Sequence, residues 1–447
     1  MNKLTDTLRS RFITASTWAL LEFLSHQLVR LGGNLILTRL LFPEAFGLVA
    51  VVLTVSIGIA LLTDMGVSQA IIVSKSGGDR DYINTAWTIK VVQSICISIT
   101  LIIISGPVSI HYKNPDIEWL LIITSLSALA SGLASTKPIV ARRNITHAKN
   151  IFFISLGVQI VALSFTIVLA NINPTAVSLV WGGLISTCLT TAASHLLYPG
   201  PRNILFINRS SAKHIFSFGG LVMLSSGLTF VTGEGAKLIY ASFLGMGTIG
   251  LIGLAGGISA MANQFSSVVV SKALFPALAE LSRCDDRARL RSAIEKSKLL
   301  VLIPGWIFSL SLVWMGPFLI KLLYDERYYG AGLILQLMGM VGMASALTGS
   351  YAGTLTAIGR PGLNLYILIA KAFLNLGSMW VGYKIFGGIG ILAMPVVGAF
   401  LLYPVTAVIF HKLGLWCARI DIPIFLISAL VCLWQAPKID WSAAASW

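Results

Sequence analysis

The stretch FGLVAVVLTVSIGIALL, residues 46–62, decides the fold class of this 447-residue chain. It contains no charged side chain, and its apolar residues do not alternate with polar ones. A membrane-spanning helix needs about 20 apolar residues to cross roughly 30 Å of hydrocarbon, whereas a strand of a membrane barrel alternates lipid-facing and lumen-facing residues. The stretch WLLIITSLSALASGL, residues 119–133, has the same character. Both stretches therefore predict membrane-spanning α-helices.

The composition extends this prediction to the whole chain. Hydrophobic residues make up 56% and charged residues 11%, and the mean hydropathy is +0.85. Soluble domains carry roughly 25% charged residues. We expect an all-α integral membrane protein with about twelve transmembrane helices. The apolar segments lie near residues 13–37, 46–74, 82–108, 117–136, 150–170, 175–197, 215–242, 247–270, 298–322, 330–356, 363–383 and 386–410.

A thirteenth apolar segment, residues 422–434, is short. At a rise of 1.5 Å per residue it covers only about 20 Å of the bilayer. We expect it to lie at the membrane interface or to form a poorly anchored extra span.

The net charge of +15 is distributed in alternate loops. One set of loops holds 22 basic residues and the other only five, which are Arg39, Lys113, Lys321, Arg327 and Lys384. Cytoplasmic loops of membrane proteins are enriched in Lys and Arg. The pattern predicts a multi-pass protein of the bacterial inner (cytoplasmic) membrane with its N-terminus in the cytoplasm. It does not indicate nucleic-acid binding.

An internal repeat relates the two halves of the chain. Residues 32–48 align with residues 235–251 at an offset of 203, with identities such as Gly32/Gly235, Leu41/Leu244 and Leu48/Leu251. A shift of six spans preserves orientation, as in transporters built from parallel repeats. We therefore expect two parallel six-helix lobes around a central cavity, residues 1–200 and 201–412, followed by a tail of residues 413–447.

Charged side chains inside the spans are the candidate functional residues, because such residues usually face a bundle interior or a wet cavity. Glu22, His26 and Arg30 follow one another at intervals of four, on one face of the first segment. Arg and Lys are suited to binding phosphate groups, and carboxylates can take up and release protons. The substrate-binding candidates are Arg30, His26, Lys90, Lys237, Lys371 and Asn375, and the ion-coupling candidates are Glu22, Glu234 and Asp64.

Simpler roles stay open for several of these residues. Glu22 could neutralise His26 or Arg30, and Glu234 could neutralise Lys237, because each pair shares one helix face. Lys90 could reach the membrane interface along its flexible stem. Asp64 lies near the end of its segment and could be solvated there.

Motifs of catalysis are lacking in the sequence. It contains no phosphate-binding loop of the Gly-x-x-x-x-Gly-Lys-Ser/Thr type and no His-Glu-x-x-His zinc motif. The five cysteines are far apart, and the carboxylates of Asp79 and Asp81 fit a solvated turn. We expect a transporter and not an enzyme, with no cofactor and no bound metal.

Several motifs resemble those of polysaccharide flippases, a family of the multidrug/oligosaccharidyl-lipid/polysaccharide exporter superfamily. The resemblance runs from about residue 10 to residue 412, with motifs that are individually loose but fit in order and spacing. The similar stretches are Leu40–Ala50 (LLFPEAFGLVA), Ala141–Ile145 (ARRNI), Leu274–Leu278 (LFPAL), Leu323–Ala331 (LYDERYYGA) and Gly359–Pro361 (GRP).

This resemblance implies a V-shaped pair of six-helix lobes and a transport function by alternating access. The substrate would be an undecaprenyl-diphosphate-linked oligosaccharide, moved from the cytoplasmic to the periplasmic leaflet for synthesis of a cell-surface polysaccharide such as a lipopolysaccharide or exopolysaccharide. Membrane lipids, a polysaccharide polymerase and the chain-length machinery would be partners. A multidrug or small-molecule antiporter of the same superfamily and a membrane enzyme of polysaccharide assembly are the alternatives.

Overall fold

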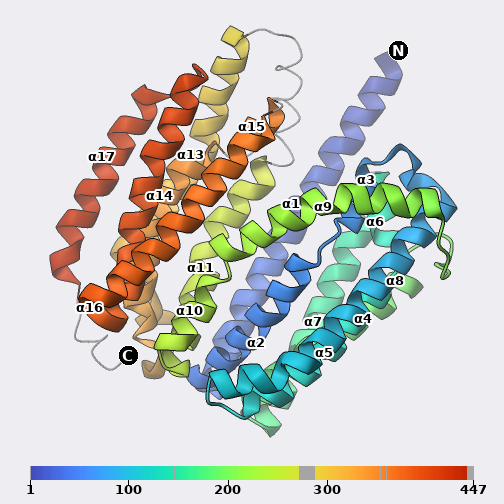
Figure 1. The fold of residues 1–447 in the computed structure, drawn as a ribbon, viewed down its shortest axis with the longest axis horizontal. Coiled ribbons are helices and arrows are strands. Elements are labelled where there is room, and N and C mark those ends of the chain that lie inside the picture. Colours follow the sequence, from blue (N-terminus) through green and yellow to red (C-terminus); the bar gives the residue numbers. More distant parts are fainter. Residues whose placement is uncertain (1, 145–146, 271–286, 352–353, 359, 440–447) are drawn as a thin grey trace. The chain divides into compact units, whose positions relative to one another are not determined.

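The computed structural model describes residues 2–144, 147–270, 287–351, 354–358 and 360–439 (Figure 1). The motif Leu274–Leu278 lies outside these residues. The described chain is helical and contains no β-strand. Its α-helices are α1 Asn2–Leu40, α2 Pro43–Leu62, α3 Val67–Val73, α4 Arg80–His111, α5 Asp116–Leu133, α6 Lys137–Arg143, α7 Ala148–Ile172, α8 Ala176–Leu196, α9 Arg209–Thr232, α10 Ala236–Phe243, α11 Met246–Val269, α13 Arg287–Leu323, α14 Ala331–Gly349, α15 Thr354–Ala357, α16 Pro361–Lys412 and α17 Ala418–Gln435.

Ten helices in the described part of the chain are long and apolar enough to cross a membrane. One of these stretches, Gly362–Lys412 in α16, is 51 residues long. It is interrupted at Gly387, where φ is +63°, a conformation that glycine adopts without steric cost. The expected segments 363–383 and 386–410 therefore both lie in α16, and the kink falls at the beginning of the second segment. The all-α membrane fold is confirmed, whereas the count of twelve crossings stays a prediction.

The C-terminal apolar segment is longer than the expected residues 422–434. Its membrane-compatible helix runs from Ala418 to Lys438, 21 residues. The extra length begins at a turn that contains Asp421, whose carboxylate is completely buried against Lys298. Because hydropathy treats a carboxylate as a break, the sequence alone placed the start of this helix too late.

Three expected segments are each divided into two helices. Residues 46–74 form α2 and α3, residues 215–242 fall in α9 and α10, and residues 330–356 fall in α14 and α15. At the first break the carboxylate of Asp64 accepts a hydrogen bond from the backbone N–H of Gly66, at 2.8 Å. The second break, at residues 233–235, holds two of the chain's glycines, which lower the cost of leaving the helix.

The internal repeat is visible in the helix boundaries. α1 ends at Leu40 and α2 begins at Pro43, whereas α10 ends at Phe243 and α11 begins at Met246. Both pairs of boundaries are separated by the repeat offset of 203 residues. The leucine in each intervening turn, Leu41 or Leu244, is buried. Equivalent sequence therefore forms the same helix–turn–helix corner twice.

The chain divides into two compact units, Met1–Phe230 and Val231–Trp447. In the first unit, α1 packs on α7, α7 on α8, and α4 on α5. In the second, α14 packs against α11, α13 and α16. Of the most apolar stretch that ends with this helix, within Glu326–Gly349, 67% is buried in protein. The lobe boundary expected after residue 200 stays a prediction.

Small residues make the close packing of α14 possible. A Cβ atom at Gly339 would lie 2.9 Å from the backbone oxygen of Ser309, and one at Gly342 would lie 2.6 Å from its Oγ. These glycines let α13 approach α14 closely, as small residues do at helix contacts in membranes.

Candidate functional site

The polar face of α1 lines a cavity of about 480 Å³ in the first unit. We call it the Glu22 cavity. It lies where α1 meets α6, α7 and α8, and it brings two of the three candidate residues of α1 together with polar side chains from distant parts of the sequence. Its polar lining includes Glu22, His26, Arg142, Ser155, Gln159 and Tyr198.

Glu22 is held by partners from two other helices. Its carboxylate lies 3.5 Å from Arg142 Nη2, on α6. The Ser155 hydroxyl, on α7, donates to Glu22 Oε1 at 3.1 Å and lies 3.2 Å from His26 Nε2. Ser155 thus links the carboxylate to the imidazole, and Arg142 is the basic partner of Glu22.

Tyr198 lines the same cavity beyond the end of α8. Burial raises the pKa of its phenol, because desolvation disfavours the phenolate. Tyr198 therefore stays neutral at physiological pH and offers a hydroxyl for hydrogen bonding.

Arg30 lines a second, smaller cavity of about 210 Å³ in the same unit. We call it the Arg30 cavity. Gln159 and Ser186 contribute to the linings of both cavities, so the two cavities adjoin between α1, α7 and α8. Gln159 Nε2 donates to the backbone oxygen of His26 at 3.1 Å. Its Oε1 is buried and has no hydrogen-bond partner among the described residues.

The second unit contains a cavity of about 230 Å³, which we call the Lys371 cavity. Lys237, Lys371 and Asn375, three of the substrate-binding candidates, line it together. Lys237 Nζ lies 2.5 Å from Glu234 Oε2, so the predicted neutralisation of this pair is observed. Lys371 is exposed and forms no ion pair within the described residues. Further polar lining comes from Ser259, Asn263, Ser345 and Thr348.

The repeat places these cavities at equivalent positions. Gly33 and Asn34 line the Arg30 cavity, and their counterparts at the offset of 203, Ala236 and Lys237, line the Lys371 cavity. The corresponding helix face is therefore turned toward a cavity in each unit, but one carries an amide and the other an ammonium group.

Lys90 and Asp64 lie apart from these three cavities. Lys90 is half-buried on α4 and contributes to none of the three linings. Asp64 accepts hydrogen bonds from Gly66 N at 2.8 Å and from Ser226 Oγ at 3.2 Å. The geometry of Asp64 is that of a side chain that stabilises a turn and attaches it to α9.

Several cavity residues were not among the sequence candidates. Arg142 looks like an ordinary basic loop residue, and Ser155 and Gln159 are uncharged. One signal could have found the latter two, since they lie four residues apart within the largely apolar helix α7. That spacing puts both side chains on one face.

Comparison with known proteins identifies the family. Residues 36–331 match the family described as "Polysaccharide biosynthesis protein", and the chain belongs to it. The lipopolysaccharide biosynthesis protein WzxC of Escherichia coli (strain K12) is 22% identical over 390 residues, 86% of this chain and 78% of WzxC. The succinoglycan biosynthesis transport protein ExoT of Rhizobium meliloti (strain 1021) is 21% identical over 384 residues, 85% of this chain and 76% of ExoT.

Two groups of solved structures share the fold. The lipid II flippase MurJ, in an inward closed conformation, has a TM-score of 0.65 at 15% identity and covers 96% of this chain and 98% of its own. An inward-facing multidrug resistance transporter of the MATE family and the MOP superfamily has a TM-score of 0.65 at 14% identity, covering 87% and 94%. The expected membrane transporter fold is therefore confirmed.

Proposed function

We propose that this chain is a flippase that moves an undecaprenyl-diphosphate-linked oligosaccharide from the cytoplasmic to the periplasmic leaflet of the bacterial inner membrane. The names of its relatives support this proposal, since one refers to lipopolysaccharide biosynthesis and another to succinoglycan transport. The product would be a cell-surface polysaccharide. A polysaccharide polymerase and the chain-length machinery would then receive the substrate on the far side.

The observation that carries the proposal is a set of cavities, within an apolar helical protein, whose linings include charged and polar side chains. A diphosphate and several sugars must cross roughly 30 Å of hydrocarbon, where unsatisfied polar groups and charges are costly. The Lys371 cavity offers ammonium groups and side-chain amides. The Glu22 and Arg30 cavities offer guanidinium, imidazole, amide and hydroxyl groups. These groups can replace the water that an anionic sugar lipid loses.

We assign distinct roles to the cations and the carboxylates. Lys237, Lys371 and Asn375 bind the anionic part of the substrate in the second unit, and Arg30 and His26 bind it in the first. Glu22 and Glu234 are the ion-coupling groups, because each holds a cavity-lining cation, Arg142 or Lys237. Protonation of either carboxylate would release its cation for the substrate. Lys90 and Asp64 line none of these three cavities, so we do not include them among the proposed binding residues.

A multidrug antiporter is the second candidate, since the MATE transporter shares the fold. An antiporter of cationic drugs needs net negative charge at its binding site. The ammonium group of Lys371 has no carboxylate partner in the described residues, which disfavours a cationic ligand there. As a separate part of the proposal, the N-terminus lies in the cytoplasm and each lobe contains six transmembrane helices.

Reconstitution tests the proposed function. Purified protein in vesicles should move a fluorescent undecaprenyl-diphosphate sugar between leaflets without ATP, as measured by the fraction accessible to a membrane-impermeant quencher. The matched control is the same lipid with a monophosphate linker, which should move more slowly. Movement that requires ATP, or efflux of cationic dyes without movement of the sugar lipid, would contradict the proposal.

A further inference from the structure

A segment without helix connects α8 to α9, and its backbone is hydrogen-bonded to side chains of α4. We call residues 201–208 the strap. The hydrogen-bond partners of its later residues are buried polar side chains near the beginning of α4. The backbone N–H of Phe206 donates to Thr88 Oγ1 at 3.0 Å. The Thr88 hydroxyl lies 3.1 Å from the backbone oxygen of Phe206. Asn208 N donates to Thr85 Oγ1 at 2.9 Å.

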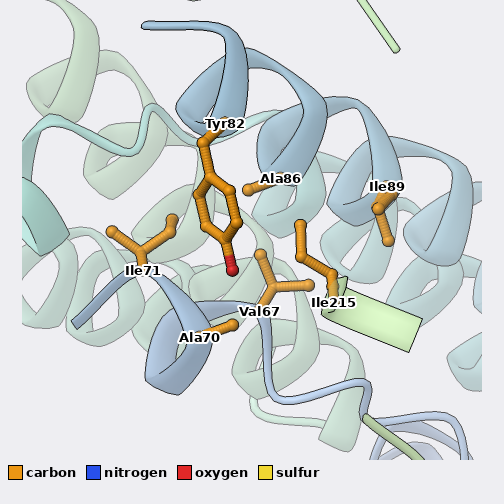
Figure 2. Packing of buried hydrophobic residues seen from close by; sticks show 7 residues of the cluster. All are labelled: Val67, Ala70, Ile71, Tyr82, Ala86, Ile89 and Ile215. Atoms are coloured by element: carbon orange, nitrogen blue, oxygen red, sulfur yellow. The ribbon is translucent and has the colours of Figure 1, made fainter. Parts of the chain in front are cut away.

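The beginning of the strap is fixed by Asn203. Its Nδ2 donates to Thr136 Oγ1 at 2.7 Å, and its Oδ1 accepts from Ser135 Oγ at 2.7 Å. Beyond the strap, Ile215 of α9 packs into the hydrophobic cluster around Tyr82 (Figure 2). Tyr82 OH also lies 3.1 Å from His214 Nδ1. The strap is therefore held at both ends and along its length.

Four consecutive apolar side chains along this strap are exposed. Their exposed fractions are 50% for Ile204, 69% for Leu205, 39% for Phe206 and 63% for Ile207. The hydrogen bonds of the backbone to α4 hold the segment in this exposed position. Such an apolar patch would be costly in water, so it requires a cover outside this unit.

Its place in the chain indicates what that cover is. The strap joins two helices that are long and apolar enough to span a membrane, Ala176–Leu196 and the stretch that begins at Arg209. A short link between two spans must lie at the membrane surface. Exposed basic residues stand at both ends of the strap and just beyond it, namely Arg202, Arg209 and Lys213. Basic residues at this depth attract anionic lipid headgroups.

We propose that the strap is a lipid-binding surface, with Leu205 and its apolar neighbours inserted among the acyl chains and Arg202 and Arg209 bound to anionic phospholipid headgroups. The strap belongs to the set of loops rich in Lys and Arg, which are expected on the cytoplasmic side. We therefore assign this surface to the cytoplasmic leaflet. The bound lipid would cover the patch and fix the connection between α8 and α9 at the membrane surface. This proposal does not depend on the identity of the transported substrate.

Site-specific fluorescence tests the insertion. An environment-sensitive fluorophore is attached at Leu205→Cys in a variant without the five native cysteines, in nanodiscs of phosphatidylcholine with or without phosphatidylglycerol. The matched control is Ser76→Cys, an exposed polar position in the turn before α4. The emission at 205 should be blue-shifted relative to 76 and quenched by lipids that carry a shallow spin label. Equal emission at both sites, or a blue shift without lipid quenching, would overturn the proposal.

Native mass spectrometry tests the headgroup contacts without any cysteine replacement. The Arg202→Gln/Arg209→Gln double variant should retain phosphatidylglycerol roughly tenfold less tightly than wild type. The control is Arg80→Gln, which removes an exposed charge outside the strap. Equal retention by the double variant and wild type would contradict the role of these arginines, and a thermal melt will show that the variant is folded.

Discussion

Lys298 Nζ lies 2.6 Å from Asp421 Oδ1, and both side chains are completely buried. Tyr351 OH donates to Asp421 Oδ2 at 2.7 Å, and Lys298 Nζ lies 3.3 Å from the centre of the Tyr351 ring. Burial raises the pKa of this phenol well above its ordinary value, so the tyrosine remains a donor. The pair connects α13 to α17 inside the second unit.

Two further contacts join the same two helices. Trp306 Nε1 donates to Ser428 Oγ at 2.7 Å, and the rings of Trp314 and Trp434 stack with centroids 5.0 Å apart. α17 is therefore attached to α13 by an ion pair, a hydrogen bond and an aromatic stack at successive levels. This arrangement makes α17 part of the second unit and not a loose tail.

Removal of one partner of the buried ion pair should destabilise the protein. We expect Lys298→Met or Asp421→Leu to lower stability by about 3–5 kcal/mol, because each leaves an uncompensated buried charge. The Lys298→Met/Asp421→Leu double variant should recover much of this loss. Thermal unfolding in detergent measures both effects. A double variant as unstable as the sum of its singles would argue against the coupling, and Ser428→Ala, costing about 1 kcal/mol, serves as the reference.

Arg30→Ala should abolish transport while the protein still inserts at the normal level. Arg30 lines a cavity beside α1, where its guanidinium can bind a phosphate in bidentate geometry. Arg30→Lys should retain part of the activity, since the charge survives but the geometry does not. Transport by reconstituted vesicles and the amount of protein in the membrane are the two measurements. Full activity of the alanine variant would exclude a role in binding.

Lys371→Met should reduce transport roughly tenfold or more, because a hydrogen bond to a charged group contributes about 1.5–3 kcal/mol. The matched control is Lys384→Met, an exposed lysine on the same helix that does not line the cavity. Transport rates of the two variants at equal protein level decide the point. Similar losses in both would show that the effect is not specific to the cavity.

Glu22→Gln should weaken the response of transport to a pH gradient. The amide cannot exchange a proton, and it no longer attracts Arg142 as a carboxylate does. Wild type should transport faster when a gradient is imposed, and the Glu118→Gln control, at an exposed position on α5, should behave like wild type. If the Glu22→Gln and Glu234→Gln variants respond as fully as wild type, these carboxylates do not couple protons.

The topology is tested by single cysteines in the loops. A membrane-impermeant reagent added from outside should label positions 113 and 327 and leave position 290 protected, because the basic loops are expected in the cytoplasm. Labelling of intact cells and of inverted vesicles gives the two sides. Labelling of 290 from outside with 113 protected would reverse the orientation.

Local sequence properties were sufficient for the class of protein and for much of the cavity face of α1. Hydropathy is a sum over neighbouring residues, so membrane helices such as α2 and α7 can be found without tertiary contacts. Helical periodicity places Glu22, His26 and Arg30 on one face for the same reason. The Glu234–Lys237 pair was also accessible, since its members lie three residues apart on the sequence.

Tertiary structure alone decided which side chains meet. Ser155 reaches Glu22 across 133 residues of sequence and Lys298 reaches Asp421 across 123, and no local rule pairs groups so far apart. The same limit explains why the sequence placed the start of α17 too late. The carboxylate of Asp421 looks like a helix break in the sequence, and the distant lysine that compensates its charge cannot be identified there.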